Sequence, residues 1–69
     1  MPLSFGEIGK KYQIKRVTGN DTVRTHLRNI GIVENSYIQI VQSIQGNMIV
    51  EVKGSRIALD SSLVRRIIV

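Results

Sequence analysis

The spacing of apolar side chains predicts one helix near the middle of the first half of the chain. Three apolar residues recur at helical intervals and would share one stripe: Val23, Leu27 and Ile30. Asn20 or Asp21 can accept a free backbone N–H at the start of this helix. Gly31 directly follows the stripe, where a helix often ends on a residue with positive φ. We therefore predict one helix of about three turns, which is close to the average length.

After this helix the apolar period changes to two, which is typical of strands. Apolar and polar residues alternate in three segments: 37–41, 48–53 and 56–59. Turn residues separate these segments at 45–47 and at 54–55. In the second segment Met48, Val50 and Val52 are expected to face the core, because alternate residues of a strand lie on opposite faces of a sheet.

One further strand is expected near each end of the chain, over residues 12–17 and 66–69. The residues before 12 are expected to form a loop, and Asp60 can cap a single helical turn that carries Leu63 and Val64. The predicted fold class is mostly β, a small barrel of about five strands with one short helix inserted after the first strand. One domain would span residues 1–69. Ten residues are expected in its core: Ile14, Leu27, Ile30, Ile38, Ile40, Val50, Val52, Ile57, Leu59 and Ile67.

The small size of the chain limits how it can be stabilised. A domain of 69 residues buries only about 60% of the surface of its unfolded chain. It has no cysteine, so its stability must come from a dense core of Ile and Val or from self-association into a homo-oligomer. The absence of cysteine, of a membrane-spanning apolar run and of a signal peptide favours a cytoplasmic protein.

The net charge of +5 favours binding to acidic partners. These could be a nucleic acid, an anionic membrane surface or an acidic protein face, while the alternative is a charge that only keeps the domain soluble. Arg24 and Arg28 lie four residues apart, on the helix face beside the apolar stripe. Nucleic-acid binding usually adds exposed aromatic side chains. The chain offers only three: Phe5, Tyr12 and Tyr37.

Few side chains are available for catalysis or for binding a metal. The only histidine, His26, would need a nucleophile and an orienting acid to act as a base. A metal site needs three or four ligands. The strong candidates show no ligand spacing: Glu7, Asp21, His26, Glu34 and Glu51. We therefore predict no enzyme activity, no cofactor, no tight metal site and no small-molecule substrate.

Two segments of the chain carry motifs in a fixed order and spacing. In residues 24–35 a basic helix carries a leucine and ends in an Ile-Gly-apolar step. In residues 50–59 alternating apolar residues are followed by glycine, two further residues and then Ile-Ala-Leu. Together these segments resemble the FeoA family of accessory proteins in bacterial ferrous iron uptake. Leu3 and Gly9 match the family before these segments and residues 67–69 match it after them, so the resemblance covers nearly the whole chain.

Three positions depart from the family pattern. Residues 34–35 are Glu-Asn where the family has Pro-Gly, and asparagine also tolerates positive φ. The hairpin loop at 44–47 is shorter than in the family and has no proline, and Asp60 stands where an arginine is common. These departures bear on any partner contact made by the loop or by that arginine.

The resemblance implies an SH3-like barrel that works with a membrane ferrous iron transporter carrying a cytosolic GTP-binding domain. It implies no catalysis, and it leaves weak transition-metal binding open. We expect the partner to dock near the helix and the hairpin turn. The candidate partner-binding residues are Arg24, Leu27, Arg28, Ile44 and Asn47.

Two other functions fit the same sequence. One is a small basic barrel that binds nucleic acid, which would lose affinity steeply as salt rises. The other is a detached regulatory domain of a metal-dependent repressor, since that fold also occurs in such repressors. The chain has no pair of helices that could read DNA, which argues against the repressor.

Overall fold

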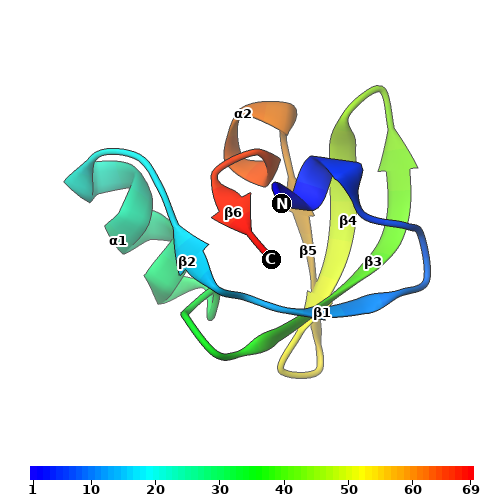
Figure 1. Ribbon diagram of the computed structural model, residues 1–69, viewed down its shortest axis with the longest axis horizontal. Coiled ribbons are helices and arrows are strands. Elements are labelled where there is room, and N and C mark those ends of the chain that lie inside the picture. Colours follow the sequence, from blue (N-terminus) through cyan, green and yellow to red (C-terminus); the bar gives the residue numbers. More distant parts are fainter.

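Two antiparallel sheets form the body of the molecule, as Figure 1 shows. The first sheet has four strands in the order β1 (Lys11–Gln13), β3 (Tyr37–Ile44), β4 (Asn47–Val52) and β5 (Ser55–Leu59). The second sheet pairs β2 (Arg16–Val17) with β6 (Ile67–Ile68). This architecture comes from a computed structural model that describes all residues, 1–69. It confirms the predicted mostly β fold with one short helix, which follows the second strand instead of the first.

Three short helical segments complete the structure: η1 (Leu3–Phe5), α1 (Asp21–Asn29) and α2 (Ser61–Val64). The helix α1 lies at one side of the molecule, and the turn between β3 and β4 lies at the other side (Figure 1). None of these helices is long and apolar enough to span a membrane.

The prediction of a single strand over residues 12–17 is wrong, because the chain forms two strands there, β1 and β2. Ile14 lies at the break and is fully buried. Its N–H donates to the carbonyl oxygen of Ser36 at 2.8 Å, whereas the next residue, Lys15, donates to the carbonyl oxygen of Ile68 at 2.7 Å. The chain therefore leaves one sheet and enters the other at this point, and the fold has six strands instead of about five.

Both hairpins turn through two residues that have positive φ. Gln45 and Gly46 have φ values of 53° and 84°, and Lys53 and Gly54 have values of 51° and 80°. Positive φ at both positions matches the twist of the flanking strands, which is why such turns are favoured in tight hairpins. The turn predicted at 45–47 is confirmed at residues 45–46, and the turn predicted at 54–55 lies one residue earlier, at 53–54.

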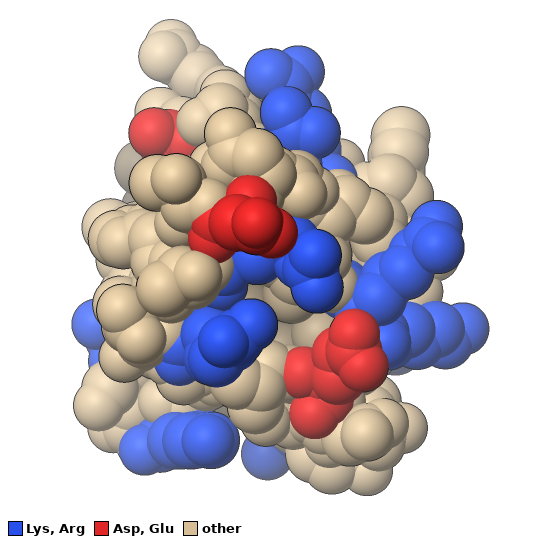
Figure 2. All heavy atoms as spheres, turned by 90° about the vertical axis from the view of Figure 1, so that its left-hand side faces the viewer, with Lys and Arg blue, Asp and Glu red and all other residues tan.

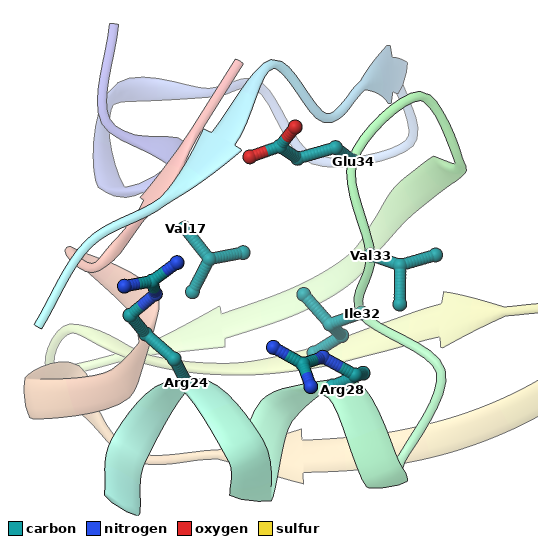
Figure 3. A pocket seen from close by; sticks show the side chains of 6 residues that line it. All are labelled: Val17, Arg24, Arg28, Ile32, Val33 and Glu34. Carbon is teal, nitrogen blue, oxygen red and sulfur yellow. The ribbon is translucent and has the colours of Figure 1, made fainter. Parts of the chain in front are cut away.

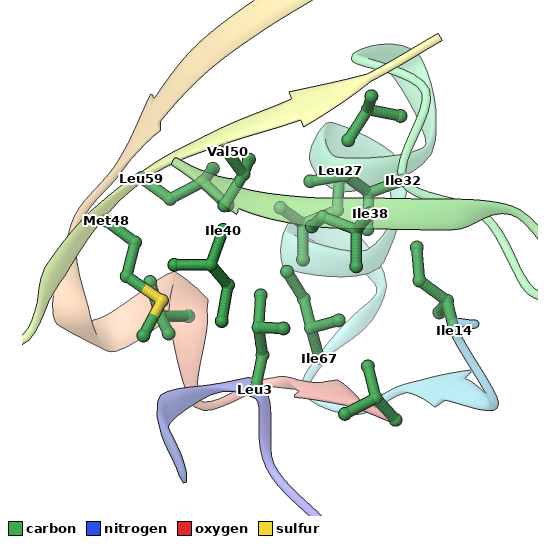
Figure 4. Packing of buried hydrophobic residues seen from close by; sticks show 13 residues of the cluster. Leu3, Ile14, Leu27, Ile32, Ile38, Ile40, Met48, Val50, Leu59 and Ile67 are labelled. Carbon is green, nitrogen blue, oxygen red and sulfur yellow. The ribbon is translucent and has the colours of Figure 1, made fainter. Parts of the chain in front are cut away.

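The core is a cluster of thirteen buried residues, all of them apolar (Figure 4). It contains the predicted residues except Ile30 and Ile57, which are partly buried and pack against its margin. Met48 faces the core as expected. The core also includes four residues that the strand pattern missed: Leu3, Ile32, Val64 and Val69.

Helix α1 begins and ends where the sequence predicts. The side chain of Asn20 accepts a hydrogen bond from the N–H of Val23 at 2.9 Å, so Asn20 is the N-cap residue. Gly31 follows the helix with a φ of 95°. This positive φ changes the direction of the chain, and the segment that follows forms one wall of the groove described below.

The two ends of the chain lie side by side (Figure 1). The N-terminal amine of Met1 donates to the Val69 oxygen at 2.6 Å, and the N–H of Val69 donates to the Met1 oxygen at 2.7 Å. Pro2 and Ile68 form a further antiparallel bridge beside them. The first residues therefore extend the β2–β6 sheet, which explains why Leu3 and Val69 reach the core.

Candidate functional site

A groove of about 320 Å³ opens between α1, β2 and the segment that follows α1 (Figure 3). Its lining combines apolar side chains with two arginines and one glutamate: Val17, Arg24, Arg28, Ile32, Val33 and Glu34. In Figure 3 the two arginines extend from α1 on one side of the groove, and Glu34 extends from the opposite side. We call this feature the α1 groove.

Local structure explains how these residues come together. A spacing of four residues places Arg24 and Arg28 on one face of α1. The change of direction at Gly31 then places the segment from Ile32 to Glu34 at another side of the groove, as Figure 3 shows. Ile32 is 1% exposed, so its side chain anchors this segment in the core, while Val33 is half-buried beside it.

Neighbouring carboxylates pair only weakly with the guanidinium groups of the α1 groove. The Nη1 atom of Arg24 lies 4.0 Å from Oδ1 of Asp21, at the limit of an ion pair, and the Asp21 side chain is fully exposed. Such a pair contributes little to stability because water screens it. The other ion pair of the molecule joins Arg56 and Glu51 in the four-stranded sheet at 3.6 Å. Arg28 therefore has no carboxylate within 4 Å, and its donors are free to bind an acidic group.

Basic side chains predominate on the side of the molecule that carries α1. Figure 2 shows this side, with many lysines and arginines around a smaller number of acidic side chains. Arg16 of β2 and Arg66, directly before β6, are also exposed. This distribution gives the α1 groove a positive surrounding, as expected from the net charge of +5.

The structure separates the five predicted partner-binding residues. Arg24 and Arg28 are exposed and lie together in the α1 groove. Leu27 is fully buried, so the expectation that it contacts a partner is wrong: the apolar stripe of α1 faces the core. Ile44 is 55% exposed at the end of β3. Oδ1 of Asn47 accepts the N–H of Ser61 at 2.9 Å, so this side chain supports α2.

The hairpin turn and the helix do not form one surface. The turn between β3 and β4 lies at the side of the molecule opposite α1 (Figure 1). A partner that fills the α1 groove would therefore leave Ile44 uncovered. Sequence reasoning also missed Val17 and Glu34 as groove residues. Both residues lie outside α1, so the helical spacing of Arg24 and Arg28 gives no sign of them.

No three side chains of the His, Asp and Glu type gather into a group that could hold a metal ion. His26 is exposed on α1. The carboxyl group of Asp60 lies at the N-cap of α2. The Ser62 hydroxyl and then the Leu63 N–H bond to this carboxylate and lower its pKa below the ordinary value. These bonds serve the helix end, and Asp60 has no catalytic partner among them.

One family model matches the whole chain. The family model described as the FeoA domain matches residues 1–69. A protein of Methanocaldococcus jannaschii, provisionally named Fe(2+) transport protein A, is 28% identical over 68 residues. That alignment covers 99% of this chain and 83% of the archaeal protein.

Solved structures give the same result for the fold. The crystal structure of an iron uptake regulatory protein, FeoA, is 30% identical with a TM-score of 0.86, covering 96% of this chain and 88% of that one. The zinc-complexed FeoA of Stenotrophomonas maltophilia is 24% identical with a TM-score of 0.85, covering 99% of this chain and 87% of that one. The latter is described as a prokaryotic SH3 domain protein, so the predicted SH3-like fold is confirmed.

Proposed function

The chain belongs to the FeoA family, and on that basis we propose that it is a cytoplasmic accessory protein of ferrous iron transport. In this proposal the protein docks on the cytosolic GTP-binding domain of a membrane ferrous iron transporter and regulates it. The related protein of Methanocaldococcus jannaschii is named as a transport protein and aligns with 99% of this chain, which supports the assignment to iron transport.

The observation that carries the docking proposal is the free guanidinium group of Arg28 beside the apolar lining of the α1 groove. Arg28 has no carboxylate partner within 4 Å, and Arg24 has only the exposed Asp21 at 4.0 Å. Arginine binds carboxylates through two parallel hydrogen bonds, so a partner's acidic side chains could pair with both groups. Val17 would then contact apolar atoms of the same partner segment.

The charge of the surrounding surface supports the same choice of partner. A positive face speeds the encounter with an acidic protein surface and orients it. Reversing charges at the contact replaces attraction with repulsion, which slows association and weakens binding. Because both arginines are exposed, their substitution should change the free energy of unfolding by no more than about 0.5 kcal/mol.

The test is a calorimetric titration of the transporter's purified GTP-binding domain with this protein. We expect the double variant Arg24→Glu, Arg28→Glu to bind at least about tenfold more weakly, while its thermal melt stays near that of the wild type. The double variant Lys10→Glu, Lys11→Glu is the matched control, since it changes the net charge equally away from the α1 groove. Equal binding by wild type and the arginine variant would contradict the proposed docking and would indicate that these arginines belong to an ordinary solvated surface.

The same proteins separate this function from nucleic-acid binding. We expect the wild type to be retained poorly on DNA at physiological salt, because few aromatic side chains are available to stack on bases. Strong retention that falls steeply with salt and is lost in the arginine variant would favour the nucleic-acid function instead.

A further inference from the structure

The segment between η1 and β1 presents two large apolar side chains to solvent. Phe5, at the end of η1, is 74% exposed, and Ile8 is 61% exposed. Single exposed apolar residues are common on protein surfaces, but these two lie three positions apart on one short segment. In Figure 1 this segment, drawn in blue, runs along the side of the molecule opposite α1. It is therefore separate from the α1 groove.

Hydrogen bonds hold Ile8 at the tip of a tight turn. The N–H of Lys10 donates to the carbonyl oxygen of Glu7 at 3.2 Å, and Gly9 has a φ of 87°. Positive φ at the third position is typical of a type II turn, with Ile8 at the second position. The N–H of Gly9 also donates to the Ile40 oxygen at 2.6 Å, which ties the turn to β3. Polar residues and proline are usual at such turns, so folding gives no reason for an isoleucine at the tip.

Lysines flank these apolar side chains. The ammonium group of Lys10 lies 5.5 Å from the centre of the Tyr12 ring, and the Tyr12 hydroxyl accepts the N–H of Glu7 at 2.8 Å. Lys10 is thereby held beside the turn, and the exposed Lys11 begins β1 next to it. Glu7 is the only acidic residue among the first eleven. We call Phe5, Ile8, Lys10 and Lys11 the N-terminal patch.

We propose that the N-terminal patch binds the surface of an anionic lipid bilayer. Phe5 and Ile8 would enter the headgroup region, where apolar side chains leave water. Lys10 and Lys11 would pair with lipid phosphates, and each basic residue near an anionic membrane strengthens its attraction. A second copy of the chain fits less well, because two copies of the patch would bring four lysines together. Two apolar residues and two lysines give reversible binding, which suits a peripheral protein.

This inference does not rest on the proposed docking through the α1 groove. The two surfaces lie on opposite sides of the molecule, so a protein partner and a bilayer could bind at the same time. Each surface can also be disabled without touching the other.

The test is cosedimentation of the purified protein with lipid vesicles. One preparation contains equal amounts of phosphatidylglycerol and phosphatidylcholine, and the other contains phosphatidylcholine alone. We expect binding to the anionic vesicles only. The double variant Phe5→Ser, Ile8→Ser should lower the partition coefficient at least about tenfold, since it removes most of the apolar area that would be buried. The control Tyr37→Ser removes a side chain that is 57% exposed outside the patch, and we expect it to bind within about twofold of wild type.

The charge contribution is tested with the two matched double variants. We expect the lysine variant Lys10→Glu, Lys11→Glu to lower the partition coefficient at least about tenfold. The arginine variant Arg24→Glu, Arg28→Glu should lower the partition coefficient by a factor several times smaller. Equal losses would mean that net charge alone drives binding and would overturn the patch. Wild-type protein that stays in solution with both vesicles would overturn it as well. So would a dimer, seen in sedimentation velocity, that is lost in the Phe5→Ser, Ile8→Ser variant. Thermal melts near that of the wild type will show that each variant is folded.

Discussion

The N–H of Ile32 donates a hydrogen bond to the carbonyl oxygen of Leu27 at 2.9 Å. Inside this bond the N–H of Gly31 donates to the carbonyl oxygen of Arg28 at 3.0 Å, and the two bonds together form a Schellman motif. Leu27 and Ile32 are both buried in the core. The same two residues thus fix the end of α1 and the start of the segment after it, which forms one wall of the α1 groove.

The Schellman motif depends on positive φ at Gly31. A valine at this position would have to adopt a φ of 95°, which β-branched residues rarely do. We expect Gly31→Val to lower the free energy of unfolding by about 1 kcal/mol or more in chemical denaturation. Gly31→Asn is the control, because asparagine tolerates positive φ better and should lose less. A valine variant as stable as the wild type would show that the helix can end in another way.

Leu27 should act as a core residue and not as a surface contact. Its side chain is fully buried, so Leu27→Ala should lower the free energy of unfolding by about 2–5 kcal/mol. Ile44→Ala is the matched control. Ile44 is 55% exposed, so we expect its loss to change stability by no more than about 0.5 kcal/mol. Similar melting temperatures for the two variants would contradict the buried position of Leu27.

Asn47 is expected to stabilise the fold through α2. Its Oδ1 atom, at the start of β4, accepts the N–H of Ser61, the first residue of that helix. Asn47→Ala leaves this N–H without its partner and should lower the free energy of unfolding by about 1 kcal/mol. Asn47→Asp keeps an accepting oxygen and should retain most of the stability. Binding of the GTP-binding domain should be unchanged in both variants, since Asn47 lies away from the α1 groove.

Asp60 should make the stability of the protein fall in strong acid. The Ser62 hydroxyl and the Leu63 N–H donate hydrogen bonds to its carboxylate and hold its pKa in the folded protein below the ordinary carboxyl value. The stabilisation is therefore present above the ordinary carboxyl pKa and is lost as the pH falls through the lower pKa of the folded protein. Asp60→Asn keeps a capping oxygen that does not titrate, so its melting temperature should fall less between pH 5 and pH 2. Parallel pH profiles would rule out this role.

Local patterns in the sequence predict most of the fold. The stripe of Val23, Leu27 and Ile30 gives the helix, and Asn20 and Gly31 give its ends, because caps and periodicity act within a few residues. The break at Ile14 could not be predicted. Alternation from Tyr12 to Ile14 stops at Arg16, but this does not reveal a change of sheet, which exists only because β3 and β6, the partners of β1 and β2, belong to different sheets.

The candidate site is predictable only in part for the same reason. A spacing of four residues was enough to place Arg24 and Arg28 on one face of α1. The same helical spacing placed Leu27 on the apolar stripe and predicted it in the core, where it is fully buried, so its place among the partner-binding candidates conflicted with that pattern. Val17 joins the groove from β2, and only the three-dimensional fold brings it there. The distance between α1 and the hairpin turn also follows from the folded arrangement of the sheets.

The adjacency of Met1 and Val69 makes this fold nearly circular in its connectivity. A short peptide could join the two ends, and the chain could be opened instead at the exposed Lys53–Gly54 turn to give a circular permutant with the same sheets. For the same reason the domain could be placed within a surface loop of another protein, because its entry and exit points would lie together and the host loop would not be stretched.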